Sequence, residues 1–99
     1  MNSLASISLS GMNAAQVQLQ SSAHNIANNA TEDFHRQEVD QEAQAGGGVT
    51  ARINKSPRVG TSLETDIVQQ LSAKNAFLAN LAVFKRSNDM VGALLDTKA

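Results

Sequence analysis

Two histidines, His24 and His35, are the side chains of this sequence best suited to metal binding or acid–base chemistry. A metal site needs more ligands at suitable spacing, but Asn28 stands one helical turn after His24 and the first carboxylate is Glu32. His35 has acidic neighbours, which are typical of a charged loop. The sequence has no cysteine, no Gly-x-Ser-x-Gly motif, and no Lys followed by Ser or Thr after its triple glycine. We therefore expect no catalytic residue, no metal ion and no cofactor, and hence no enzyme.

The composition limits what the chain can bury. Of its 99 residues 41% are apolar, three are Phe, and Tyr and Trp are absent. A domain this small has little core and usually depends on disulfides, a metal ion or association with other chains. Because cysteine is absent, we expect a single small domain that is stabilised by association.

The charge distribution excludes several classes of protein. The net charge is −1, without the basic patch of a nucleic-acid binder. No apolar run approaches the roughly 18 residues of a membrane span, so we expect no membrane insertion. The first ten residues lack the basic start and apolar stretch of a secretory signal peptide, so we expect no cleaved signal.

Residues 1–31 contain no Asp, Glu, Lys or Arg, and their polar side chains are mainly Ser, Asn and Gln. Small uncharged polar groups suit close packing between helices, whereas a solvated helix usually carries charge. Apolar residues recur at spacings of three and four, so we predict a helix over residues 3–29 that stops at Asn28-Asn29; a partly disordered tail is the alternative. The expected seam is Leu9, Met12, Gln16, Leu19, Ala23 and Ile26, beside a stripe of small residues, Ser8, Gly11, Ala15 and Ser22.

Gly11 is unfavourable inside such a helix by about 1 kcal/mol relative to Ala. A close approach of another helix would explain its presence, and a kink is the alternative.

A second, longer helix is predicted over residues 62–97. The residues Thr61-Ser62-Leu63-Glu64 fit a capping box, and Glu64 and Asp66 place negative charge where the helix dipole favours it. No proline interrupts the segment, so the helix extends roughly 50 Å and needs a partner helix. Its expected packing face is Ile67, Leu71, Phe77, Leu78, Leu81, Phe84, Val91 and Leu95, interrupted by Lys74.

The linker of residues 30–61 has a different texture. Residues 34–39 and 49–53 are candidates for two short strands joined through the triple glycine at residues 46–48. A disordered connector is the alternative. The expected fold is therefore mainly α, with two long terminal helices in an antiparallel coiled-coil hairpin and a loop or small β-hairpin between them.

The residues after the first helix resemble a known signature. Flagellar rod, hook and hook-associated proteins share an N-terminal motif of Asn-aliphatic-Ala-Asn, then Thr, then Gly and an aromatic residue. The matching positions here are Asn25, Ile26, Ala27, Asn28, Thr31 and Phe34. Asp33 stands where the family usually has Gly, and Asp adopts a positive φ less readily than Gly.

The second helix is similar to the C-terminal motif of the same family. The matches include Ala-Phe at residues 76–77, Ala79, Asn80, Val83, Met90 and the aliphatic pair at residues 94–95. Together the two matched segments, residues 4–34 and 62–98, cover about two thirds of the chain. The linker is shorter than rod proteins usually have.

The resemblance implies a single minimal axial domain over residues 1–99 whose terminal helices pair and line a hollow axial tube. It implies a structural subunit of the bacterial flagellar basal-body rod, which spans the periplasm and supports motility. Its partners would be itself, other axial proteins and the type III export apparatus. Two other classes remain open: a regulatory or chaperone-like protein that mimics rod helices, and a membrane-surface amphipathic helix. The membrane-surface helix is disfavoured because the N-terminal segment has no Lys or Arg to contact anionic lipid.

Overall fold

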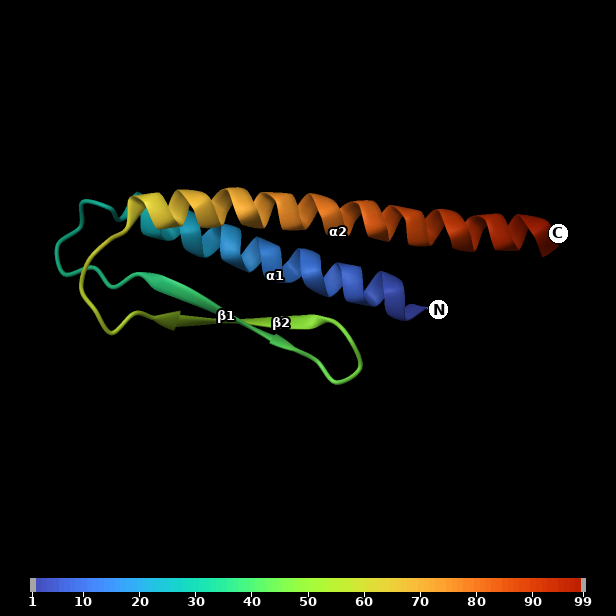
Figure 1. The fold of residues 1–99 in the computed structure, drawn as a ribbon, viewed down its shortest axis with the longest axis horizontal. Helices are drawn as coiled ribbons and strands as arrows, with labels where there is room; N and C mark the ends of the chain where they lie inside the picture. Colours follow the sequence, from blue (N-terminus) through green and yellow to red (C-terminus); the bar gives the residue numbers. More distant parts are fainter. Residues whose placement is uncertain (1, 99) are drawn as a thin grey trace.

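Two helices and a two-stranded hairpin make up the part of the chain that the structure describes, residues 2–98, with side chains described for residues 4–94. In this computed structural model, helix α1 spans Asn2–Ala27, strands β1 and β2 span Gln37–Ala43 and Val49–Lys55, and helix α2 spans Leu63–Lys98 (Figure 1). The prediction of a mainly helical fold with a small β-hairpin between two long helices is confirmed.

The two helices pack side by side and antiparallel. Gly11 of α1 lies against Asn80 of α2, and Asn25 is hydrogen-bonded to Asp66, so the same number of residues separates the two contacts on each helix. At this register Asn2 lies level with about Asp89, since both helices rise about 1.5 Å per residue. Helix α2 therefore continues past the start of α1 (Figure 1). The backbone measures 63 × 24 × 13 Å with a radius of gyration of 17.2 Å, against about 13 Å for a compact domain of this length.

Helix α1 lies between α2 and the hairpin. Both strands pack against α1, and among the described residues neither strand packs against α2. Two sides of α1 are therefore covered, and a charge on either covered side would be desolvated without a partner. The absence of charge from the exposed positions of α1, such as Asn13 and Gln16, has no explanation within one chain. The expected close helix packing of this segment is confirmed, and the hairpin adds a second covered side that the sequence did not indicate.

Small and polar side chains fill the interior. The buried apolar residues among those described are Met12, Ala14, Ala15 and Ala73, and the buried polar ones are Ser8, Ser21, Ser22, Asn25, Asp66 and Ser87. A β-carbon on Gly11 would lie 2.6 Å from the side chain of Asn80, so the helices approach closely at that residue. This confirms the close approach as the reason for Gly11.

The hairpin is antiparallel, with Gln37 paired to Lys55 and Ala43 paired to Val49. Its tip turns at Gly47 and Gly48, both with φ of 93°, and a β-carbon on Gly47 would lie 2.7 Å from Ile7 of α1. The glycines therefore supply both the positive φ and the space for the tip to rest on α1.

The predicted strand at residues 34–39 is wrong by about three residues, because β1 begins at Gln37. Residues 34–36 instead bond to the segment after β2: Gly60 N–H donates to Phe34 O at 2.9 Å and Ser56 N–H to Arg36 O at 2.7 Å. The second predicted strand extends two residues further than expected, to Lys55.

Both helix ends near the hairpin differ slightly from expectation. Helix α1 stops at Ala27, two residues before the predicted end at 29, and α2 begins at Leu63 rather than 62. Ser62 precedes the first helical residue and its carbonyl accepts the first helical hydrogen bond, from Asp66 N–H at 3.0 Å, so Ser62 rather than Thr61 stands at the capping position.

Candidate functional site

Three polar side chains meet where α1 ends and α2 begins: Asn25, Arg36 and Asp66, here called the junction. Asn25 Nδ2 donates to the carbonyl of Gln37 at 2.9 Å, and the N–H of Gln37 donates to Asn25 Oδ1 at 2.8 Å. The amide side chain thus satisfies both backbone groups of the first residue of β1. The same Nδ2 donates to Asp66 Oδ1 at 3.2 Å. One buried asparagine therefore ties α1, β1 and α2 together.

Arg36 and Asp66 form the charged half of the junction. Arg36 Nε donates to Asp66 Oδ2 at 3.3 Å, and Nη2 forms an ion pair with Oδ1. The side chain of Asp66 is 1% exposed and that of Arg36 is 16% exposed. The hydrogen bond with Asp66 raises the pKa of the Arg36 guanidinium, so it stays charged beside the buried carboxylate. Both carboxylate oxygens have partners, so the junction is suited to holding segments together rather than to binding an ion.

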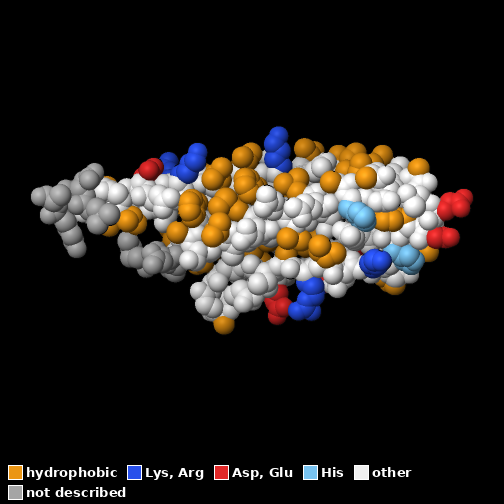
Figure 2. Space-filling view, turned by 180° about the vertical axis from the view of Figure 1, so that it is seen from behind, with side chains coloured by type: hydrophobic (Ala, Val, Ile, Leu, Met, Phe, Trp, Pro, Cys, Tyr) orange, Lys and Arg blue, Asp and Glu red, His pale blue; other side chains and the backbone are white. Residues whose placement is uncertain are grey.

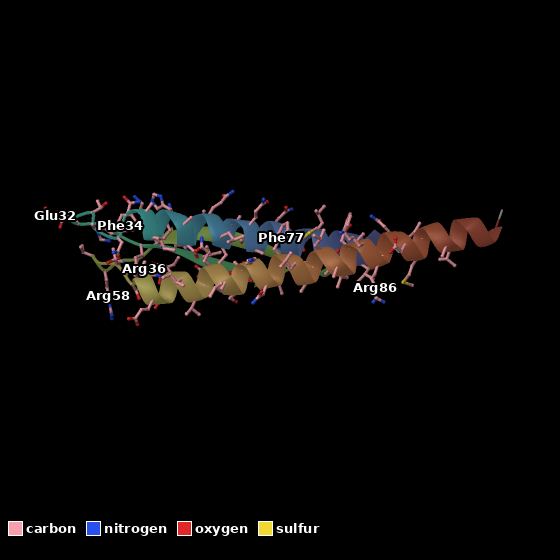
Figure 3. All side chains as sticks on the ribbon, turned by 90° about the horizontal axis from the view of Figure 1, so that it is seen from above. Glu32, Phe34, Arg36, Arg58, Phe77 and Arg86 are labelled. Atoms are coloured by element: carbon pink, nitrogen blue, oxygen red, sulfur yellow. The ribbon has the colours of Figure 1, made fainter. Side chains whose placement is uncertain are left out.

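The turn after α1 uses the side chains of the N-terminal motif. Asn28 Nδ2 donates to His24 O at 2.9 Å, and Thr31 Oγ1 donates to Asn28 Oδ1 at 3.1 Å. The rings of Phe34 and His24 pack against each other at a tilt of 51°, with centroids 5.5 Å apart. Figure 3 shows Phe34 and Arg36 at this end of the molecule. Asp33 has a φ of 55°, so the chain turns left-handed where the resembled family has glycine.

The structure thus brings four residues of the N-terminal motif, Asn25, Asn28, Thr31 and Phe34, to one end of the helix pair. Of the other two, Ile26 is half-buried and Ala27 is exposed. In the C-terminal motif, Asn80 fits against Gly11 and donates to Ala76 O at 2.8 Å. Ala79 and Met90 are exposed.

The predicted packing residues divide into three groups. Met12 and Ala15 are buried, and Leu19, Ile26, Phe77, Leu81 and Phe84 are half-buried. Leu9, Ile67, Leu71, Leu78 and Val91 are exposed. The side chain of Leu95 lies outside the described residues. Within one chain, α1 therefore meets α2 through its small residues more than through the expected apolar seam. Any role of the exposed group in assembly stays a prediction.

Hydrophobic side chains gather over the helices on the face seen in Figure 2. Fourteen large hydrophobic side chains are exposed among the described residues, and nine of these belong to α2. The nine on α2 are Leu63, Ile67, Val68, Leu71, Leu78, Val83, Met90, Val91 and Leu94.

Sequence reasoning missed the junction as a unit. Asp66 was interpreted as a partner of the helix dipole, and Arg36 was assigned to a possible strand. No spacing along the chain relates residues 25, 36 and 66, because they come from separate elements. The one available signal was Arg36 itself, the first cationic residue after an uncharged N-terminal segment.

Neither metal chemistry nor a membrane span is indicated by the described part of the chain. Residues 2–98 hold no cluster of three or more acidic or histidine side chains placed to share a metal ion. His35 Nδ1 is hydrogen-bonded to the carbonyl of Ser56 at 2.8 Å. Neither helix within these residues is long and apolar enough to cross a bilayer.

No protein-family model and no curated protein matches the chain.

Proposed function

We propose that this chain is a self-associating structural subunit of the bacterial flagellar basal-body rod. The observation that carries self-association is the surface that one copy leaves exposed. Its accessible area is 6908 Å², whereas a compact monomer of 10.5 kDa exposes about 5,400 Å². The difference of about 1,500 Å² is close to what two interfaces of ordinary size cover, at about 800 Å² per partner.

The character of the surface supports the same proposal. Ile67, Leu71 and Leu78 lie on one outer stripe of α2, at spacings of four and seven residues, and all three are exposed. Exposing an apolar stripe of this kind to water is unfavourable in free energy, and burying it against another subunit removes that penalty. In the proposed rod, α1 and α2 form an antiparallel coiled coil, and the outer stripe of α2 contacts a neighbouring subunit.

The axial assignment is supported by the structural roles of the motif residues. Asn25, Asn28 and Thr31 form the hydrogen bonds that end α1 and start the hairpin. Asp33 adopts the left-handed conformation at the family's glycine position. The motif residues therefore have structural roles at the end of the helix pair, which supports the axial assignment. In this proposal the chain is exported through the type III apparatus, and its partners are itself and other axial proteins.

Two measurements test the proposal. Sedimentation velocity over a concentration series should show oligomers larger than a monomer, and flagellar basal bodies purified from the source bacterium should contain the chain. A strictly monomeric chain that is missing from basal bodies would refute the proposal. A monomer recovered in a one-to-one complex with another axial protein would favour the chaperone-like alternative.

A paired variant tests the outer stripe. Replacing Leu71 and Leu78 by Gln should reduce self-association and leave the melting temperature nearly unchanged, because both side chains are already exposed. Asn75→Gln, an exposed position on the same helix, is the matched control and should change neither. Unchanged association of the double variant would show that this stripe is not an interface.

A further inference from the structure

A groove of about 440 Å³ lies alongside α1, between α2 and the tip of the hairpin. Gly11, Ala14 and Ala15 form part of its lining from α1, and Ser72 and Ala76 line it from α2. None of its lining residues is charged. Small side chains leave room for another helix to approach closely, as Gly11 already does for Asn80. The groove can therefore accept a helix only if that helix is also uncharged.

Residues 90–94 of α2, here called the extension, have that character. They lie past the level of Asn2, where α1 no longer runs beside α2 (Figure 1). Their sequence, Met-Val-Gly-Ala-Leu, carries no charge. Met90 is 62% exposed and Leu94 is 53% exposed, and the two are one helical turn apart on the same face.

We propose that the extension of one copy packs in the groove of a second copy. This rests on the proposed self-association and specifies which surfaces meet. The extension cannot fill its own groove, because Ala76 and Met90 are 14 residues apart on one continuous helix, about 21 Å. Each copy has one groove and one extension, so the contact can repeat from copy to copy. The excess exposed area of about 1,500 Å² is then shared between this contact and the outer stripe of α2.

Cysteine cross-linking tests the contact directly, because the chain has no cysteine of its own. Chains carrying Ala76→Cys are mixed with chains carrying Met90→Cys and oxidised. A disulfide needs Cα atoms within about 7 Å, so a linked heterodimer forms only if the two residues meet across copies. The control replaces Met90→Cys by Lys85→Cys, an exposed position on the opposite side of α2. We expect the Ala76→Cys chain to cross-link to the Met90→Cys chain. The yield of cross-linked dimer with the Lys85→Cys chain should be at least tenfold lower.

A second pair of variants tests the groove without cross-linking. Ala76→Lys places a charge in the groove, whereas Asn75→Lys places the same charge at the neighbouring exposed position outside its lining. Sedimentation should show at least a tenfold weaker association for Ala76→Lys and little change for Asn75→Lys. Circular dichroism should show equal helix content and equal melting temperatures for both.

The outcomes separate this inference from the proposed function. If the wild-type chain associates but 76 does not cross-link to 90, or both lysine variants associate equally, the groove contact is refuted and self-association stands. If the wild-type chain does not associate at any concentration, both proposals fall.

Discussion

Replacing Asn25 by Ala should destabilise the whole chain, because this side chain joins three elements at the junction. The substitution removes three hydrogen bonds. Asn25 Nδ2 donates to Gln37 O at 2.9 Å and to Asp66 Oδ1 at 3.2 Å, and Asn25 Oδ1 accepts from the N–H of Gln37 at 2.8 Å. Each typically contributes about 1 kcal/mol, and a bond to a charged group more. Alanine returns about 0.6 kcal/mol as the better helix former. We therefore expect a net loss of about 2–3 kcal/mol in the free energy of unfolding.

For a domain of 99 residues, each kcal/mol lowers the melting temperature by about 4–8 °C, so Asn25→Ala should melt about 10–20 °C below wild type. The assay is thermal unfolding followed by circular dichroism. Hydrogen exchange at the amide of Gln37 gives a local readout, since that N–H loses its acceptor and should exchange faster. Asn25→Asp has the same size but places a second carboxylate beside Asp66, so it should destabilise at least as much.

The matched control is Asn13→Ala, an exposed asparagine on the same helix. It carries the same gain in helix propensity and should melt at or slightly above the wild-type temperature. If Asn25→Ala melts within about 2 °C of this control, the junction does not hold the three elements together, and the reasoning is refuted.

Asp33→Gly should raise stability by up to about 1 kcal/mol, because Asp33 has a φ of 55° that only glycine adopts without strain; a lower melting temperature would contradict this. Ser21 Oγ is buried without a hydrogen-bond partner among the described residues, whereas Ser22 Oγ donates to Gln18 O at 2.8 Å. Ser21→Ala should therefore raise the melting temperature more than Ser22→Ala, and equal shifts would count against the unpaired hydroxyl. Phe84→Ala should cost about 2–4 kcal/mol by denaturant titration, at the lower end for a buried aromatic because the ring is only half-buried; an unchanged midpoint would show that the ring contributes no packing.

Local signals in the sequence were sufficient for the helices and the tip of the hairpin. Asn28-Asn29 marked the end of α1 to within two residues, because Asn readily leaves the helical conformation. The triple glycine marked the hairpin tip, because positive φ is accessible to glycine at no steric cost. Gly11 indicated a close helix contact, because glycine weakens a helix and a β-carbon at this position would clash with Asn80.

These local signals did not predict the position of strand β1. Its residues, Gln-Glu-Val-Asp-Gln-Glu-Ala, are mostly polar and show no clear alternation. Its position follows from pairing with β2 and from the two hydrogen bonds between Gln37 and Asn25. A strand whose stability comes from partners distant in sequence leaves little trace in its own residues.

The sequence by itself determined the two long helices and the lack of charge on α1, since these follow from composition and short-range spacing. The dependence on association stays a prediction. Only the tertiary structure decided that α1 is covered on two sides, that Asn25, Arg36 and Asp66 meet, and which leucines of α2 stay exposed. The physical reason is that a helix with apolar residues on several faces does not specify which face its partner will cover. That choice was made by the small residues of α1, which let the two backbones approach at Gly11 and left the larger side chains outside.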